Sequence, residues 1–484
     1  MKKIIVYVLA ITLMLTCFIP VKAILQGEEN YYNYIETRRN DIIAEYNADN
    51  AAVYIMKAVE GKKLDKINAL GELISLYNQY GKSINIVCAM STLMDDPYFS
   101  QNISDEQSEI IREILSTPTY NKTYISGNFE IRYNSTSNST PVYIISLMNA
   151  LTTIETSFIT DLSLNRPQSS ILTHRYHFYV TSDYDSNSNP AATFFGFTSG
   201  FRTSYSVFYG IQDADLNSSL TTYEKGTAAH EYMHAINHNY FNLLYLDSWF
   251  KESWANWAAL IKYGISTIPD YAVNAYLSNT NYPLTSNNFI DNYGKVLLPM
   301  FIRQNYGGDS TVAEVIKKLP ISGDAITAIG NALPGDSVTL NSIFADFMRY
   351  NYSPKYFYTT HSNGWNDRPL ISGNYSSSYS SFTASNQYLD TLSAKYYEFD
   401  IPSVGIYRYN IIVNAGTSTI TGKLMLSYDS GYATNTSLGS GTYLEENINI
   451  SSSAYSKGCI MIVNTDSLNA TGNITITVTR TRIH

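Results

Sequence analysis

Two histidines and a glutamate lie together in the stretch 227–237, which reads TAAHEYMHAIN. His230 and His234 are four residues apart, so a helix would present both imidazoles on one face, one turn apart. Imidazoles in that arrangement can bind one divalent metal ion, and Glu231 beside them can act as a base toward a water molecule at the metal. The alternative is a solvated helix that carries both histidines by chance. The spacing favours the metal site.

A third ligand is expected from a second helix. His238 follows His234 on the same stripe, but it lies about 12 Å along a straight helix from His230, too far to share one ion with both. Seventeen residues lie between His234 and Glu252, which is enough for the first helix to end, turn and be followed by another. We therefore expect Glu252 to be the third ligand, the alternative being a solvated helix glutamate.

The segment around Glu252 has the features of a rigid helix. Asp247 and Ser248 can cap its start, and residues 249–258 read WFKESWANWA, with three of the four tryptophans of the chain. Asn256 lies one turn beyond Glu252, where its side chain could orient a ligating histidine. We expect this helix to be buried and to support the metal ligands.

The two segments together resemble the gluzincin metallopeptidases, the thermolysin-like group with two histidines and one glutamate on zinc. The second segment is similar to the W-x-x-E-G-x-A-x-W motif of bacterial secreted metalloproteases, with Ser253 in place of the glycine. Asn256 stands where thermolysin has an aspartate. The resemblance covers residues 124–350 and implies a zincin-like catalytic domain with a mixed sheet lobe and an α-helical lobe. It implies Zn²⁺ on His230, His234 and Glu252, with Glu231 as the general base.

Gluzincins also use a tyrosine or histidine of the helical lobe to donate a hydrogen bond to the developing oxyanion. Tyr293, in the segment DNYGK at 291–295, is our candidate, and His361 is the reserve. Helical patterns at 296–306, 310–319, 324–333 and 340–350 are expected to form the rest of this lobe. We expect the substrate to lie extended along an edge strand at 204–209.

The N-terminal part has no residues that indicate chemistry. Residues 1–23 have the charged start, short apolar core and small residues of a secretory signal peptide, so a secreted, extracellular protein is expected. Residues 24–120 show helical periodicity, with a stripe through Ile67, Leu70 and Ile74, and a capping box at 104–107. They form either a permanent helical domain or a propeptide. No later run is long and apolar enough to predict a transmembrane segment.

The remaining segments predict an α+β fold with a separate β domain. Alternation at 124–133 and 174–181 indicates strands, and an apolar helix is expected with Thr140 as its N-cap and Pro141 at its first position. The catalytic domain is expected to cover 121–370, followed by a Ser-rich linker at 371–384. Period-two runs at 385–484 predict a β-sandwich, for which a cell surface or an extracellular polymer is a suggested partner.

Composition narrows the partners. A net charge of −9 argues against nucleic acid and against an anionic membrane surface. The two cysteines after the leader, Cys88 and Cys459, lack metal-type spacing and are expected to be buried small side chains. His174 and His177 are expected to be ordinary strand residues. Loop carboxylates could bind Ca²⁺ or be solvated; they are Asp183, Asp185, Asp213 and Asp215.

The sequence therefore predicts a secreted zinc metalloendopeptidase with a polypeptide substrate. One alternative is a non-catalytic surface-binding or polymer-binding protein on a peptidase scaffold. Another is a zinc aminopeptidase, which would need acidic groups for the substrate amine. No motif for such groups stands out.

Overall fold

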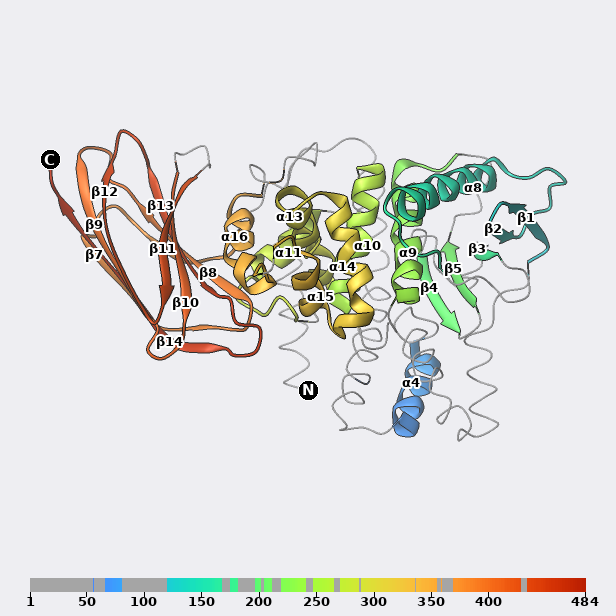
Figure 1. Ribbon diagram of the computed structural model, residues 1–484, viewed down its shortest axis with the longest axis horizontal. Coiled ribbons are helices and arrows are strands. Elements are labelled where there is room, and N and C mark those ends of the chain that lie inside the picture. Colours follow the sequence, from blue (N-terminus) through green and yellow to red (C-terminus); the bar gives the residue numbers. More distant parts are fainter. Residues whose placement is uncertain are drawn as a thin grey trace. The chain divides into compact units, whose positions relative to one another are not determined.

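The computed structural model describes residues 55, 66–80, 120–167, 175–181, 196–201, 204–210, 219–240, 247–264, 270–286, 289–335, 337–354, 358, 369–427 and 433–484. The chain divides into two compact units, Met1–Thr117 and Pro118–His484. Helices and several sheets make it a mixed α+β protein, which confirms the predicted fold class at that level (Figure 1).

In the first unit, the structure describes helix α4, Lys66–Tyr80. Its buried side chains are Ala69, Leu70 and Leu73, while Ile67 is 48% exposed. The predicted apolar stripe is therefore only partly right. Leu70 is buried as predicted, but Leu73 is buried in place of Ile74, and Ile67 lies at the surface. The expected leader and the capping box at 104–107 lie outside the described residues.

The second unit begins with a five-stranded sheet in the order β1-β2-β3-β5-β4. Its strands are β1 Lys122–Ser126, β2 Phe129–Tyr133, β3 Tyr176–Thr181, β4 Gly196–Phe201 and β5 Ser204–Gly210. Strands β2, β3 and β5 are parallel, whereas β4 is antiparallel to β5. The expected single strand at 124–133 is a hairpin, because the chain turns at Gly127 with φ +56°.

This strand order corrects one expectation. Strand β5, which contains the expected edge segment 204–209, lies between β3 and β4 and is bonded on both sides. The last strand at that end of the described sheet is β4. Only two residues separate β4 from β5, so the two strands form a hairpin, and β4 is the edge strand at this end of the described sheet.

Two long helices cover one face of this sheet (Figure 1). Helix α8, Val142–Glu155, continues into a π-helical turn, Thr156–Asp161, and packs against β2 and α9, Thr222–Tyr240. By length and composition alone Val142–Asp161 could cross a membrane. Its buried side chains instead contribute to the core, as those of a core helix do. The helix starts one residue later than predicted, with Pro141 as the N-cap, and Ile145 is exposed.

Tyr232 connects α9 to the sheet. Its ring makes edge contacts with Phe129 and Tyr176, at centroid distances of 5.8 and 5.7 Å. Phe129 and Tyr176 are register partners on β2 and β3. These contacts fix the helix that carries the two histidines against the strands.

A lobe of seven described helices follows. They are α10 Ser248–Tyr263, α11 Asp270–Ser278, α12 Phe289–Gly294, α13 Leu297–Asn305, α14 Asp309–Ser322, α15 Ala325–Ala332 and α16 Leu340–Tyr352. The four helices predicted from 296 to 350 are present as α13 to α16, with ends that differ by up to three residues. Helix α11 was not predicted, because nine residues give too few turns to show a clear period.

The C-terminal part is a β-sandwich of sheets ordered β11-β10-β13-β8-β6 and β12-β9-β14-β7. Its strands are β6 Ile371–Tyr375, β7 Ser381–Leu389, β8 Ser393–Asp400, β9 Ile406–Asn414, β10 Ile420–Ser427, β11 Ala433–Gly441, β12 Tyr443–Ser451, β13 Lys457–Asn464 and β14 Thr471–Arg482. The expected linker at 371–384 is therefore wrong. It forms β6 and the start of β7, because serine tolerates an exposed, hydrogen-bonded strand.

The first sandwich sheet buries side chains on both of its faces. Tyr397 and Ile460 point into the core between the sheets, whereas Tyr396 and Met461 belong to the core shared with the helices. The Tyr396 hydroxyl donates to the Met348 carbonyl at 2.8 Å. The sandwich thus completes the core of the helical lobe.

Candidate metal centre

Helix α9 begins with a capping box formed by Thr221 and Glu224. The Thr221 backbone N–H donates to the Glu224 carboxylate at 2.5 Å, and the Glu224 N–H donates to the Thr221 hydroxyl at 3.2 Å. Ala228, Ala229 and Met233 are fully buried, so the apolar face of the helix is filled. The capping box and the buried apolar face together determine the orientation of α9, and therefore the side on which its two histidines lie.

Helix α10 is held in place by its tryptophans, which are all fully buried. Trp254 donates to the Val312 carbonyl at 3.1 Å, and Trp257 donates to the Asp309 carboxylate at 3.2 Å. Asp247 is the N-cap and accepts from the Trp249 indole at 3.1 Å. The helix is therefore the buried support that the sequence predicts, and it packs against α9.

Three ligand atoms from these helices form a nearly equilateral triangle. The Nε2 atoms of His230 and His234 are 3.0 Å apart, and Oε2 of Glu252 lies 3.3 Å from the first and 3.4 Å from the second. In tetrahedral coordination with Zn–N and Zn–O bonds of 2.0–2.1 Å, neighbouring ligand atoms are about 3.3–3.4 Å apart. The three residues therefore fit Zn²⁺, with one coordination position left open.

The protonation states agree with this arrangement. The Asn256 amide Nδ2 donates to the Tyr293 carbonyl at 3.2 Å, which fixes the amide so that its Oδ1 faces Nδ1 of His230 at 3.1 Å. An amide oxygen only accepts, so Nδ1 of His230 carries the proton and Nε2 keeps its lone pair. That lone pair points toward the triangle, where it can bind a cation.

Glu252 is the acid in contact with both imidazoles. Burial alone would raise its pKa, but the close approach of His234 and His230 outweighs burial and lowers the pKa. The carboxylate is thus ionised, as a metal ligand must be. Its buried Oε2 accepts no hydrogen bond of ordinary geometry among the described residues, which is consistent with a place for a cation.

Glu231 lies beside the triangle and is 5% exposed. Its carboxylate and the ligand nitrogens of His230 and His234 all lie within 4.8 Å of one another, so these three alone could also bind a metal. We assign the ligand role to Glu252 because its oxygen has the ligand–ligand distances of a tetrahedral site to both imidazoles. Glu231 is then left for a water molecule at the open position.

Tyr293 lies at the same centre. Its ring stacks on the His230 imidazole with a centroid distance of 5.9 Å and an interplanar angle of 11°. It is part of α12, which packs against α10. The structure therefore brings the oxyanion candidate next to the ligands.

Two further residues considered in the sequence, His177 and Cys459, lie on strands of the described structure. His177 is buried in β3, 3.7 Å from the Glu130 carboxylate, and burial lowers its pKa, so it is an ordinary strand residue. Cys459 is fully buried in β13, as expected of a small apolar side chain. The remaining candidates lie outside the described residues or have an undescribed side chain; they are His174, His238, His361, Cys88, Asp183, Asp185, Asp213 and Asp215.

Three polar residues around Tyr293 were missed. Asp291, Asn292 and Lys295 are only 3%, 2% and 1% exposed. Their types favour a solvated helix end, so burial could not be inferred from the pattern. The signal was the compact run DNYGK itself, in which polar residues surround a glycine next to the candidate tyrosine.

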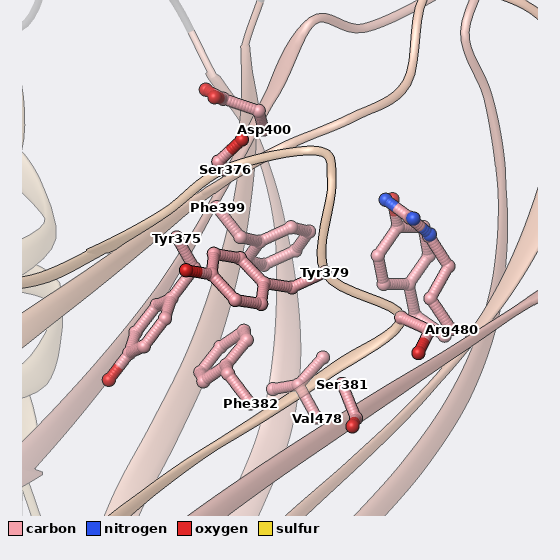
Figure 2. Close-up of a pocket in the computed structure, with 11 residues that line it drawn as sticks. Tyr375, Ser376, Tyr379, Ser381, Phe382, Phe399, Asp400, Val478 and Arg480 are labelled. Carbon is pink, nitrogen blue, oxygen red and sulfur yellow. The ribbon is translucent and has the colours of Figure 1, made fainter.

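A separate shallow recess lies in the β-sandwich. Figure 2 shows Tyr375, Tyr379 and Phe382 gathered there, with Arg480 to one side. The rings of Tyr375 and Phe382 stack at 3.7 Å, and Tyr379 is 60% exposed. The residues that line this recess include none of the candidate metal ligands.

No family model and no curated protein matches the chain. Among solved structures, the chain is similar to the pre-peptidase C-terminal domain of a collagenase from Bacillus anthracis, with 18% identity over 24% of this chain and 100% of that chain, at a TM-score of 0.17. It is also similar to BtGH115A, a family GH115 4-O-methyl-alpha-glucuronidase, with 6% identity over 67% of this chain and 54% of that chain, at a TM-score of 0.15. At these TM-scores neither likeness is evidence of a shared fold.

Proposed function

We propose that the chain is a secreted zinc metalloendopeptidase with a zincin-like catalytic domain of the gluzincin type. The observation that supports this most is the triangle of His230, His234 and Glu252, with atom distances of 3.0, 3.3 and 3.4 Å. Two helices supply the ligands, as the resemblance implies. Glu231, whose carboxylate lies within 4.8 Å of a ring nitrogen of each histidine, is available as the base.

Each residue near the ligands has a distinct part in peptide hydrolysis. Bound Zn²⁺ would polarise the scissile carbonyl and lower the pKa of water at the open position. Glu231 takes the proton of the attacking water and later gives it to the leaving amine. Tyr293 donates a hydrogen bond toward the carbonyl oxygen as its charge grows. Asn256 keeps His230 in the tautomer that binds metal through Nε2.

Strand β4 is the proposed place for the substrate backbone. It ends the described sheet, and α9 packs against it. An extended peptide could add to β4 as a further strand and pass the metal ligands on α9. Because a strand edge binds backbone at many positions along a chain, this supports cleavage within polypeptides rather than removal of single N-terminal residues.

The sandwich recess is the proposed contact for an extracellular polymer. Its exposed Tyr379 and the stacked pair Tyr375 and Phe382 offer aromatic faces beside a cation, Arg480. Aromatic faces and cations are common in sites that bind other molecules. This proposal is independent of the metal centre.

The function is tested with the secreted protein on casein, with and without a chelator. We expect hydrolysis that the chelator abolishes and that added Zn²⁺ restores. Glu231→Gln should retain about one zinc per chain and lose nearly all turnover, because the amide cannot accept the proton. Full activity in this variant would remove Glu231 as the base, and activity in metal-free protein would exclude the whole mechanism.

A further inference from the structure

The peptide backbone around Tyr293 is held by a group of polar residues, which we call the support cluster: Asn279, Ser286, Asp291, Asn292 and Lys295. Asp291, Asn292 and Lys295 are buried, and the other two are partly buried. The Asn279 amide donates to both Asp291 oxygens, at 3.2 and 2.9 Å. The Lys295 ammonium donates to the Ser286 carbonyl at 2.5 Å and to Asn292 Oδ1 at 3.2 Å. Burying a lysine is costly unless its donors are used, so these bonds define one position for the segment.

Gly294 lets this segment lie against α11. A Cβ at this position would be 2.0 Å from the Ala272 carbonyl oxygen and 2.8 Å from the Cβ of Tyr276. No other residue fits without moving backbone. Tyr293 is therefore placed by close backbone contact as well as by the hydrogen bonds of the support cluster.

The loop that carries part of the support cluster is also bonded to the sandwich. The Ala394 backbone N–H donates to the Thr280 carbonyl at 2.8 Å, and the Leu284 N–H donates to the Leu392 carbonyl at 3.0 Å. Leu392 and Ala394 belong to the core that the sandwich shares with the helices. A continuous set of contacts thus runs from the start of β8 through loop 279–286 to Lys295 and Tyr293.

We propose that Lys295 is a positioning residue for Tyr293, and that the β-sandwich is part of the device that sets the place of this tyrosine beside the metal ligands. This inference rests on the proposed function for the role of Tyr293. Lys295 follows the tyrosine by two residues and donates to Ser286 and Asn292, which both precede it. The sandwich then contributes to turnover and is more than an appended binding module.

The first test is hydrogen–deuterium exchange on the full chain, which needs no activity. Lys295→Met keeps the length of the side chain but removes its donors, and it should speed exchange of the amides in 279–295 while those of 228–236 stay unchanged. Lys318→Met, on the exposed side of α14, is the matched control and should change neither segment. Unchanged exchange in 279–295 would overturn the role of Lys295 even if the protein proved inactive.

The second test is a double-mutant cycle on casein hydrolysis. Lys295→Met should lower kcat about 10- to 100-fold with zinc content and KM retained, because a displaced donor no longer meets the oxyanion. In a Tyr293→Phe background, Lys295→Met should lower kcat only slightly further, because the hydroxyl donor that Lys295 positions is already absent. Independent, multiplying losses would overturn the proposal. If Lys295→Met does not fold, Asn279→Ala replaces it in the same cycle. A wild-type protein without activity would instead count against the proposed function.

Discussion

The side chain of Asn256 joins His230 to Tyr293. Its oxygen faces Nδ1 of the histidine at 3.1 Å, and its nitrogen donates to the carbonyl of the tyrosine at 3.2 Å. Asn256 is fully buried, so both bonds are shielded from competing water. One amide thereby sets the tautomer of a proposed ligand and the place of the proposed oxyanion donor.

Asn256→Ala should weaken zinc binding about 10- to 100-fold, because His230 loses the partner that orients its ring. Titration of the metal-free protein with Zn²⁺ against a competing chelator measures this loss. Asn256→Asp is the matched variant, and it should bind at least as tightly as wild type because a carboxylate polarises the imidazole more strongly. Equal affinity in wild type and Asn256→Ala would show that the bond has no role in metal binding.

Tyr293→Phe should lower kcat about 100-fold with KM and zinc content unchanged, because only the hydroxyl that meets the growing charge is removed. The phenyl ring can still stack on His230. Steady-state kinetics on an internally cleaved, blocked peptide checks the prediction. Tyr306→Phe, in the same lobe, is the control. A rise in KM at constant kcat would instead indicate that Tyr293 binds substrate.

Asp346 gives the contact between α16 and the sandwich a pH dependence. Burial raises its pKa, but Lys423 at 2.5 Å, together with Arg349, outweighs burial and lowers the pKa below its ordinary value of 3.8. A depressed folded-state pKa adds stability above pH 3.8, and that stability is lost as the pH falls through the folded value. The carboxylate is 45% exposed, so we expect a contribution of about 0.5 kcal/mol after solvent screening.

Urea unfolding of wild type and Asp346→Asn across pH 2 to 7 measures this contribution. The variant should be less stable by about 0.5 kcal/mol at pH 6, and this difference should shrink as the pH falls below 3.8 and the aspartate takes up a proton. Glu314→Gln is the control, because the partners of Glu314 lie on its own helix. Its free energy of unfolding should not show the pH dependence that is assigned to Asp346. A difference that persists at pH 2 would mean that the asparagine acts through packing.

The relations that could be predicted are those set by local periodicity. Four-residue spacing places His230 and His234 together on any helix, and the capping residues Thr221 and Glu224 fix where that helix starts. The prediction that Glu252 lies near these histidines needed one further assumption, that a second helix follows after a short gap. In the structure its carboxylate oxygen lies 3.3 and 3.4 Å from the two imidazoles. Tyr293 was suggested by family resemblance, and it too lies at the centre.

What could not be predicted depends on contacts between distant parts. Alternation in 204–209 indicates a strand but not its neighbours, so the inner place of β5 and the outer place of β4 were missed. A Ser-rich segment is typical of a linker, but it can also form a strand when a neighbouring strand provides hydrogen-bond partners. Strand β7 pairs in this way with β14. Lysine is charged and is usually found at the surface, so the burial of Lys295 could not be predicted from its type. It is buried because Ser286 and Asn292 accept hydrogen bonds from its ammonium group.

Anomalous X-ray scattering from crystals of the zinc-loaded protein, recorded on both sides of the zinc absorption edge, tests the central claim most directly. We predict one peak at about 2.0–2.1 Å from Nε2 of His230, Nε2 of His234 and a carboxylate oxygen of Glu252. A peak that contacts the two histidines but not Glu252, or the absence of any peak between α9 and α10, would contradict the account.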